Sequence, residues 1–329
     1  MKKIAQRDCI VSMMTLVSGI CTAFCGIAAA QSFPVKPLRI IVPFPPGGTA
    51  DVVVRSLAQP LGAALGQTVI VDNRPGANTV IATELVARAP ADGHTLLITG
   101  FPFVANAIQR RNLPYDTLKD FTAVARVESS PWMVAVHPSL PVKSVVEMIA
   151  LARARPGQLT YASNPLGSGA HMIGEMMKVS GKVSILDVPY QGEVPAMVAV
   201  MGGQADMLIA HIQPLLPQMQ AHKLRVLAVT SRHRIERFKD IPTLAESGMP
   251  GFELSGTQGV TAPAATPAAV INRLSSEILR AAALPAVRES MVRQALIPAP
   301  MGAAEYGAHI VAELQNMQKL VREAQIKFE

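Results

Sequence analysis

The most informative segment of the chain reads Leu38-Arg39-Ile40-Ile41-Val42-Pro43-Phe44-Pro45-Pro46-Gly47-Gly48-Thr49-Ala50-Asp51. The apolar run predicts a strand that is buried on both faces, and the residues after the two glycines predict a helix. Glycines leave backbone N–H groups uncovered, and the first turn of a helix adds unpaired N–H groups and the positive end of the helix dipole. The segment therefore indicates an anion-binding loop, with an ordinary tight turn between strand and helix as the alternative. No Lys-Ser or Lys-Thr pair follows the glycines, which excludes a phosphate loop of the Walker type.

The same alternation of strand and helix continues along the chain. Further strands are expected at residues 68–71, 95–99, 133–137, 159–162, 183–188, 207–210 and 225–230, and helices at 51–65, 79–89, 143–154 and 169–179. The last helix carries Ile310, Leu314, Met317 and Val321 as one apolar stripe. This repetition predicts a doubly wound α/β fold.

Two segments, 128–131 and 253–263, have the composition expected of crossings between domains. Two crossings mean that one domain is inserted into the other, and a length of 329 residues is enough for two domains. Domain 1 is therefore expected to comprise residues 31–128 and 258–329, and domain 2 residues 129–257. A ligand cleft is expected between them, beyond the carboxyl ends of the strands.

The first 30 residues have the pattern of a secretory signal peptide. Lys2, Lys3 and Arg7 form a basic start, and a long apolar run ends in Ala28-Ala29-Ala30, where small residues suit cleavage before Gln31. A membrane anchor is the alternative. All 3 cysteines fall within this segment, so the mature protein is expected in the periplasm, without disulfides or thiol chemistry.

Composition and spacing exclude several function classes. Half of the residues are hydrophobic and 16% are charged, so the chain is not disordered. The formal net charge is +7, but the basic residues are scattered, and nucleic acid is not an expected partner. The seven histidines are never closer than 11 positions and no nucleophile elbow occurs, so no metal, cofactor or enzyme is predicted.

A second loop that could bind a ligand reads Tyr161-Ala162-Ser163-Asn164-Pro165-Leu166-Gly167-Ser168-Gly169-Ala170-His171. It again follows a predicted strand and precedes a predicted helix, and its Ser168 is also a candidate helix cap. One such loop in each domain would face the same cleft. The alternatives are an exported hydrolase that uses Ser163 or Ser168 with His171, and an exported protein with a purely structural role.

Further motifs follow in order along the mature chain. They are Asn73-Arg74-Pro75-Gly76-Ala77, Asp92-Gly93-His94-Thr95-Leu96-Leu97, Leu113-Pro114-Tyr115-Asp116, Val188-Pro189-Tyr190-Gln191-Gly192, Gly202-Gly203-Gln204-Ala205-Asp206 and Leu227-Ala228-Val229-Thr230-Ser231. With the two loops above, they cover nearly the whole mature chain. In these motifs the sequence resembles the solute-binding receptors of tripartite tricarboxylate transporters, the Bug family of periplasmic proteins.

The resemblance implies two α/β domains arranged as in a type II periplasmic binding protein, which close on a small organic acid or amino acid. The receptor would present this ligand to membrane permease subunits or to a sensor, as a monomer, without a cofactor and without catalysis. The implied binding residues lie in the loops and along the cleft. They are Phe44, Pro46, Gly47, Gly48 and Thr49 at the carboxylate, Asp51 bracing that loop, Thr99, Gly100 and Phe101 in a specificity wall, Ser163, Gly167 and Ser168 from domain 2, and Tyr190 and Asp206 lining the cleft.

This chain departs from the commoner family pattern at Asn164-Pro165-Leu166 and at Gly100-Phe101-Pro102-Phe103. Both departures fall where the ligand's side chain would be selected, so the resemblance leaves the identity of the ligand open. The two phenyl rings would suit a partly apolar or aromatic carboxylate. A place in the hydrophobic core is the alternative for each of them.

Overall fold

The computed structural model describes residues 33–164, 167–293, 296–323, 326 and 328. The chain divides into a short unit, Met1–Val35, and a compact unit, Lys36–Glu329, which contains every helix and strand described below. The signal peptide predicted for residues 1–30 lies outside the described residues. None of the described helices is both long enough and apolar enough to cross a membrane.

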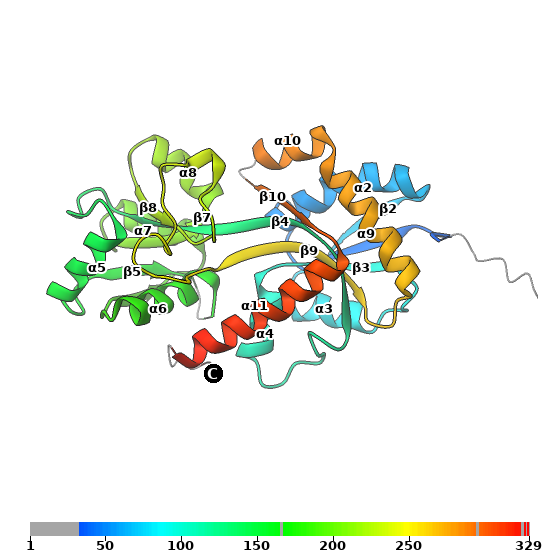
Figure 1. Cartoon of the computed structure of the whole chain (residues 1–329), viewed down its shortest axis with the longest axis horizontal. Coiled ribbons are helices and arrows are strands. Elements are labelled where there is room, and N and C mark those ends of the chain that lie inside the picture. Colours follow the sequence, from blue (N-terminus) through cyan, green and yellow to red (C-terminus); the bar gives the residue numbers. More distant parts are fainter. Residues whose placement is uncertain (1–32, 165–166, 294–295, 324–325, 327, 329) are drawn as a thin grey trace, which may run out of the picture. The chain divides into compact units, whose positions relative to one another are not determined.

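The described strands form one sheet in the order β2-β1-β3-β9-β4-β7-β5-β6, with β10 and β8 also paired to β4. Their bounds are β1 Leu38–Val42, β2 Val69–Asn73, β3 Thr95–Thr99, β4 Phe121–Val136, β5 Thr160–Ser163, β6 Leu186–Pro189, β7 Met207–His211, β8 Arg225–Val229, β9 Ser255–Pro263 and β10 Ile297–Met301. Strands β2, β1 and β3 are parallel to one another, and so are β7, β5 and β6. Strands β4 and β9 pair antiparallel and run side by side between these two parallel groups (Figure 1).

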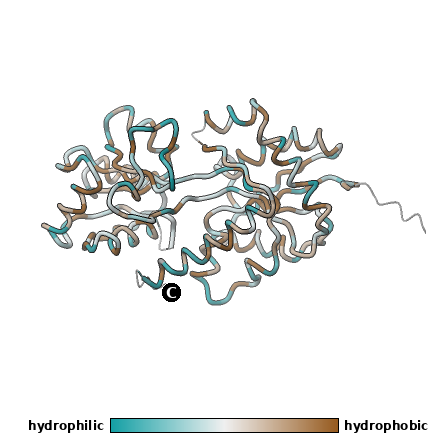
Figure 2. The backbone as a smooth tube through the Cα atoms, viewed as in Figure 1, coloured by the Kyte–Doolittle hydropathy of each residue, from teal (hydrophilic) through white to brown (hydrophobic). Residues whose placement is uncertain are grey.

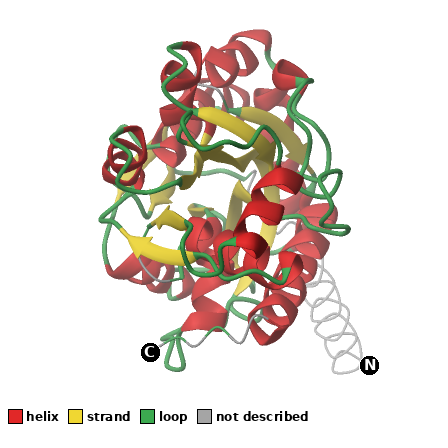
Figure 3. Cartoon of the chain, turned by 90° about the vertical axis from the view of Figure 1, so that its left-hand side faces the viewer, coloured by secondary structure: helices red, strands yellow, loops and turns green. Residues whose placement is uncertain are grey.

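Helices pack around the sheet, as a second view of the chain shows (Figure 3). They are α2 Thr49–Leu65, α3 Val80–Ala87, α4 Phe101–Gln109, α5 Val145–Ala154, α6 Gly169–Gly181, α7 Glu193–Met201, α8 Ile212–Gln220, α9 Ala268–Ala283, α10 Pro285–Arg293 and α11 Ala303–Glu323, with short 3₁₀ turns at Ala77–Thr79 and Glu236–Phe238. This arrangement confirms the α/β fold predicted from the alternating pattern.

The apolar runs of the sequence form the core, and hydrophobic stretches recur in helices and strands along the chain, while the long central pair β4 and β9 is mostly pale (Figure 2). Ile40, Ile41 and Leu97 are at most 1% exposed. Burial on both faces of a strand requires helices on both sides of the sheet. The helices that connect parallel strands provide this cover. On α11, Ile310 and Met317 are buried, in agreement with the predicted apolar stripe.

The sequence pattern indicated a crossing between domains at residues 128–131, but the strand does not break there. Strand β4 runs unbroken through it and pairs with β9 from Phe121, opposite Pro263, to Pro131, opposite Ser255. Register shifts between Ala123 and Ala125 and between Arg126 and Glu128 interrupt the pairing without ending the strand. The two predicted crossings are thus one pair of strands, and the domain boundaries given above stay a prediction.

Candidate functional site

A cavity of about 290 Å³ lies where several strands give way to helices. It is formed at the β1–α2, β3–α4 and β7–α8 junctions, together with residues of β4 and β9. The lining residues are Phe44, Pro45, Gly48, Thr49, Ala50, Phe101, Pro102, Ser130, His211, Gly256 and Gln258. The carboxyl ends of strands are where open α/β sheets bind their ligands.

The first turn of α2 faces this cavity through Gly48, Thr49 and Ala50. Gly47 has a φ of +83°, a conformation that favours glycine, and Gly48 precedes the helix in an extended conformation. The first residues of a helix have no carbonyl in a preceding turn to accept their N–H groups. The N–H groups of Thr49 and Ala50, with the positive end of the helix dipole, therefore suit a bound anion.

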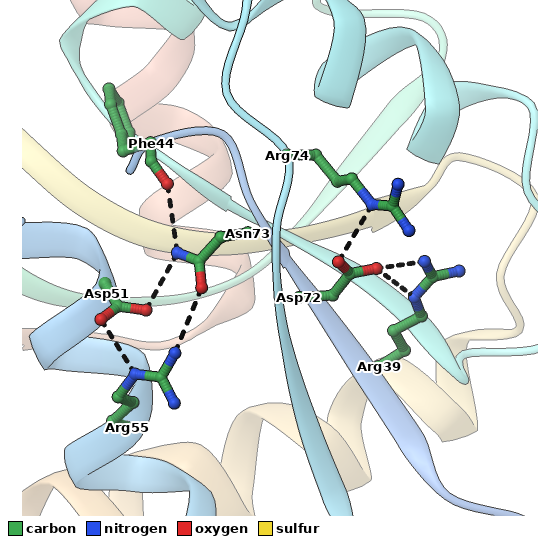
Figure 4. A network of polar contacts seen from close by, with 7 residues as sticks. All are labelled: Arg39, Phe44, Asp51, Arg55, Asp72, Asn73 and Arg74. Atoms are coloured by element: carbon green, nitrogen blue, oxygen red, sulfur yellow. Dashed lines mark hydrogen bonds and ion pairs between the residues drawn. The ribbon is translucent and has the colours of Figure 1, made fainter. Parts of the chain in front are cut away.

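Asp51 braces this loop through hydrogen bonds to Gly47, Arg55 and Asn73, of which the contacts with Arg55 and Asn73 are drawn in Figure 4. Its Oδ2 accepts from the Gly47 N–H and from Arg55 Nε, both at 2.9 Å, and its Oδ1 accepts from Asn73 Nδ2 at 2.9 Å. Asn73 Nδ2 also donates to the Phe44 carbonyl at 3.1 Å. The four contacts hold the loop between β1 and α2 in one conformation.

The same contacts engage part of the expected carboxylate cradle. The Gly47 N–H donates to Asp51, and Pro46 has no N–H to donate. Of the expected cradle residues, Gly48 and Thr49 line the cavity, and Ala50 joins them.

Asp51 is ionised at neutral pH. Burial alone would raise the pKa of Asp51, but hydrogen bonds from Arg55, Gly47 and Asn73 outweigh it and lower the pKa to about 2. Its side chain is only 3% exposed, and the Arg55 guanidinium balances its charge. The carboxylate of Asp51 therefore opposes an incoming anion only weakly.

Aromatic rings form one wall of the cavity. Phe44 and Phe101 both line it, and Phe101 packs edge-on against Trp132 with 5.4 Å between ring centroids. A Cβ on Gly100 would lie 3.1 Å from the Phe44 ring, so a larger residue there would displace that ring. Phe103 is 3% exposed and belongs to the core. Of the two phenyl rings considered for the ligand, one thus lines the cavity and one does not.

Thr99 does not belong to this wall. It is buried, and its hydroxyl makes hydrogen bonds of 2.8 Å to the Gly259 carbonyl and 2.7 Å to the Tyr306 hydroxyl. These contacts join β3 to β9 and α11. Thr99 is therefore a packing residue at the end of its strand.

None of the described residues in the loop between β5 and α6 lines the cavity, although ligand contacts were expected from this loop. The Ser163 side chain is buried and donates to the Asn164 carbonyl at 2.9 Å. Ser168 caps α6 by accepting from the His171 backbone N–H at 3.2 Å. The Gly167 carbonyl accepts from Gln109 Nε2 of α4 at 2.5 Å.

The geometry around His171 lacks the hydrogen bond that a hydrolase would need. The imidazole accepts the Gly167 N–H at its Nδ1, 3.3 Å away, and its Nε2 lies 3.8 Å from Asp187 Oδ2. Burial lowers the pKa of His171 despite the nearby Asp187 carboxylate. Ser168 meets the backbone of His171 rather than its ring, so no base is in place to activate this serine.

Tyr190 and Asp206 also lie outside the cavity lining. The Tyr190 N–H donates to the Ser163 carbonyl at 2.8 Å, and its ring packs on the hydrophobic core. Asp206 accepts from the backbone N–H of Thr160 at 2.8 Å and from its hydroxyl at 3.0 Å. It precedes β7 and is five positions before His211, roughly 16 Å away along an extended strand. Asp206 thus braces the opposite end of the sheet.

The sequence interpretation missed His211, which lines the cavity at the end of β7. Its Nδ1 lies 2.5 Å from Glu193 Oε1, and its ring lies 4.6 Å from the Trp132 ring between centroids. A detectable signal was present, because a polar residue directly after a buried parallel strand is at the ligand-binding end of the sheet. Ser130, Gly256 and Gln258, from the paired strands β4 and β9, carried no such signal.

Electrostatics around His211 favour its charged form. Burial alone would lower the pKa of His211, but the Glu193 carboxylate outweighs burial and raises it above its usual range. Burial likewise acts to raise the pKa of Glu193, and His211 lowers it overall. Glu128, hydrogen bonded to Ser130, has its pKa raised to about 7 by burial.

Gln258 offers a further polar group to the cavity. Its Oε1 is buried and has no hydrogen-bond partner among the described residues. A buried polar atom without a partner is costly, so this side chain is available to a ligand or to water. In the described part of the chain, no group of three or more His, Cys, Asp or Glu residues is placed to hold a metal ion.

Comparisons with known proteins identify the family of this chain. Residues 53–326 match the tripartite tricarboxylate transporter family receptor. The chain is 36% identical over 322 residues to the protein BugT of Bordetella pertussis, covering 96% of this chain and 99% of that protein. A solved structure of an R. palustris protein with adipate is 32% identical with a TM-score of 0.76, over 90% of this chain and 100% of the other. MatC of Rhodopseudomonas palustris, with bound malate, is 27% identical with a TM-score of 0.71, over 88% of this chain and 100% of the other. The chain therefore belongs to the family of tripartite tricarboxylate transporter receptors.

Proposed function

We propose that this chain is an exported periplasmic receptor that binds a small organic acid in the 290 Å³ cavity and releases it unchanged. The observation that carries the proposal is the open first turn of α2. Thr49 and Ala50 line the cavity there, while Asp51 is engaged by Gly47, Arg55 and Asn73. An anion can therefore be held by backbone N–H groups and the helix dipole without a basic side chain in the loop.

The remaining walls favour an acid with an apolar or aromatic body. Phe44, Phe101 and Pro102 supply apolar surface, and Gln258 supplies a buried amide oxygen that has no hydrogen-bond partner among the described residues. Adipate and malate, the acids in the two solved relatives, support a carboxylate as the recognised group. The aromatic surface adds a preference for carbon-rich acids over small hydroxy acids.

The receptor would hand its acid to membrane permease subunits, as its family membership supports. A ligand that contacts two lobes binds their closed arrangement best, so ligand occupancy would be converted into a shape that a partner recognises. The hydrogen bond between Gln109 of α4 and the Gly167 carbonyl joins residues from the two predicted domains and is a candidate contact for such coupling.

A thermal-shift screen of the mature chain, residues 31–329, tests the proposal. The panel holds mono-, di- and tricarboxylates, amino acids, aromatic acids and nicotinate, each with its neutral amide as a control. An acid at about 100 times its dissociation constant is expected to stabilise the protein by about 2.7 kcal/mol, while its amide does not. If no acid in the panel stabilised the protein, or if amides did so equally, the proposed function would be wrong.

A further inference from the structure

His211 is held in one orientation by two neighbours from different elements. Its Nδ1 lies 2.5 Å from Glu193 Oε1 at the start of α7, and its ring packs on Trp132 of β4. The side chain is 30% exposed and lines the cavity. Since Nδ1 is engaged by Glu193, the ring nitrogen that remains for the cavity is Nε2.

The contact with Glu193 also determines what Nε2 can do. The Glu193 carboxylate accepts from the Trp132 indole and from the His211 backbone N–H as well as from the ring. An ionised carboxylate has no proton to give, so Nδ1 must carry one. Nε2 is then a charged N–H donor when the ring is protonated, and a lone pair that repels anions when it is not.

Few other charges face this ring. Two carboxyl groups act on it, Glu193 from α7 and Glu128 from β4. Arg126, also on β4, acts in turn on Glu128. Helices α4 and α8 and strand β9 carry no acidic or basic residue. On α2, the only charges near the cavity are Asp51 and Arg55, which are paired with each other. The protonation of His211 is thus governed mainly by Glu193, by burial and by whatever occupies the cavity.

We propose that His211 is a ligand-binding residue whose protonated Nε2–H donates to an acid group of the bound ligand. The inference rests on the proposed function and adds a second anion-binding group to the first turn of α2. Binding then couples to protonation: an acid group raises the pKa of His211, and a rise in pH weakens binding.

The first measurement follows the ring itself. Histidine-ring NMR of the mature chain, with the His211 signal assigned from its loss in His211→Asn, is recorded across pH with and without benzoate or adipate. Each acid at saturating concentration is expected to raise the pKa of His211, and the corresponding amides are expected to leave it unchanged. A His211 pKa that neither acid moves would overturn the inference.

Calorimetry from pH 6.5 to 9, where benzoate and adipate are ionised, tests the effect on affinity. In the parent protein, Kd is expected to rise about tenfold or more over this range, the size of a charged hydrogen bond. His211→Asn should bind more weakly at pH 6.5 and show a flat profile. Glu193→Gln keeps the ring but removes the charge that favours protonation, so its profile should shift to lower pH.

His222→Asn is the matched control, because His222 is exposed in the turn after α8 and its φ of +55° is one that asparagine tolerates. It should keep the parent's pH profile. A parent-like profile in His211→Asn would refute the role of His211 and leave the proposed function intact. The proposed function fails separately, when no acid in the screening panel stabilises the parent protein.

Discussion

Asp51 shapes the binding loop without offering its charge to a ligand. Three donors surround the carboxylate, and one of them, the Gly47 N–H, would otherwise be free to bind an anion. A negative residue in the first turn also interacts favourably with the helix dipole. Asp51 therefore fixes the conformation of the loop, and the Gly47 N–H that it engages is no longer free for a ligand.

Replacing Asp51 with Asn should destabilise the protein by about 2 kcal/mol at pH 7. The folded-state pKa is lowered to about 2, so the stabilisation is complete above the unfolded pKa near 4 and is lost as the pH falls toward 2. Urea unfolding at several pH values measures this difference. The difference in the free energy of unfolding between the parent and Asp51→Asn should become smaller below pH 4. The control is Glu236→Gln, at an exposed carboxylate, which should have the parent's free energy of unfolding at every pH. A gap independent of pH would contradict the assigned role.

Phe101 and Phe103 lie on the same helix and should respond differently to truncation. Phe101→Ala removes cavity wall and its contact with Trp132, so affinity for aromatic acids should fall more than affinity for aliphatic ones. Phe103→Ala empties a core position and should cost about 3 to 5 kcal/mol of stability while leaving the ligand ranking unchanged. Calorimetry measures the ranking of ligand affinities and urea unfolding measures stability, and together they distinguish the two variants. An unchanged ranking in Phe101→Ala would remove this ring from the specificity wall.

Among the elements, helices α2 and α4 both line the cavity with their first residues, and of these two only α2 offers an open first turn. In α4 the second residue is Pro102, which has no N–H, and the Phe103 N–H already donates to the Gly100 carbonyl at 2.9 Å. In α2, Thr49 and Ala50 line the cavity with N–H groups that have no partner within the helix. The proposed anion site is therefore expected at the start of α2, with the aromatic side chain of Phe101 contributed by α4.

Gly48→Val tests the start of α2. A Cβ at Gly48 meets only the Pro45 carbonyl at 3.5 Å, and its φ of −75° suits any residue, so the fold should be retained. The branched side chain should cover the adjacent N–H groups and weaken every carboxylate together, by about tenfold or more. Calorimetry with several acids measures the effect. Ala64→Val, on the exposed side of the same helix near its other end, is the control. Parent-like affinity in Gly48→Val would move the acid group away from this loop.

At the scale of the whole molecule, α11 packs against β4 and α4. The interface contains a partly buried polar cluster with Arg126 and Glu313, next to Tyr306, whose hydroxyl meets Thr99. Glu313 Oε1 has no hydrogen-bond partner among the described residues. Burial raises the pKa of Glu313 to about 8, with Arg126 acting in the opposite direction, so this carboxyl is mostly neutral at pH 7.

Glu313→Gln should make the protein less sensitive to alkaline pH. The folded state holds a proton on Glu313 between the unfolded pKa near 4.5 and about 8, so stability falls as pH rises through this window. The amide cannot ionise, and the loss of stability between pH 5 and 8 should shrink by about 3 kcal/mol. Chemical unfolding at both pH values gives the result. Glu289→Gln, on an exposed carboxylate of α10, should retain the parent's pH dependence. An equal pH dependence in Glu313→Gln would contradict a neutral Glu313.

Prediction from the sequence succeeded where the signal is local. The boundaries of β3 were predicted exactly as residues 95–99, and Ser168 caps its helix as expected. Burial of the strands was readable because continuous apolar runs need cover on both faces. Strand β4 was predicted only over residues 133–137, since segment 128–131 was expected to be a crossing between domains, and only the pairing with β9 keeps that segment extended.

The sequence by itself determined the α/β architecture and the family, and it predicted anion binding at the start of α2, because periodicity, glycine conformation and helix dipoles act over a few neighbouring residues. Only the tertiary structure decided which groups meet at the cavity. It placed His211, Ser130 and Gln258 there, and it assigned Thr99, Ser163 and Asp206 to packing and bracing contacts. The physical reason is that strand pairing sets these positions, by bringing together residues far apart in the chain, such as Leu97 of β3 and Thr261 of β9.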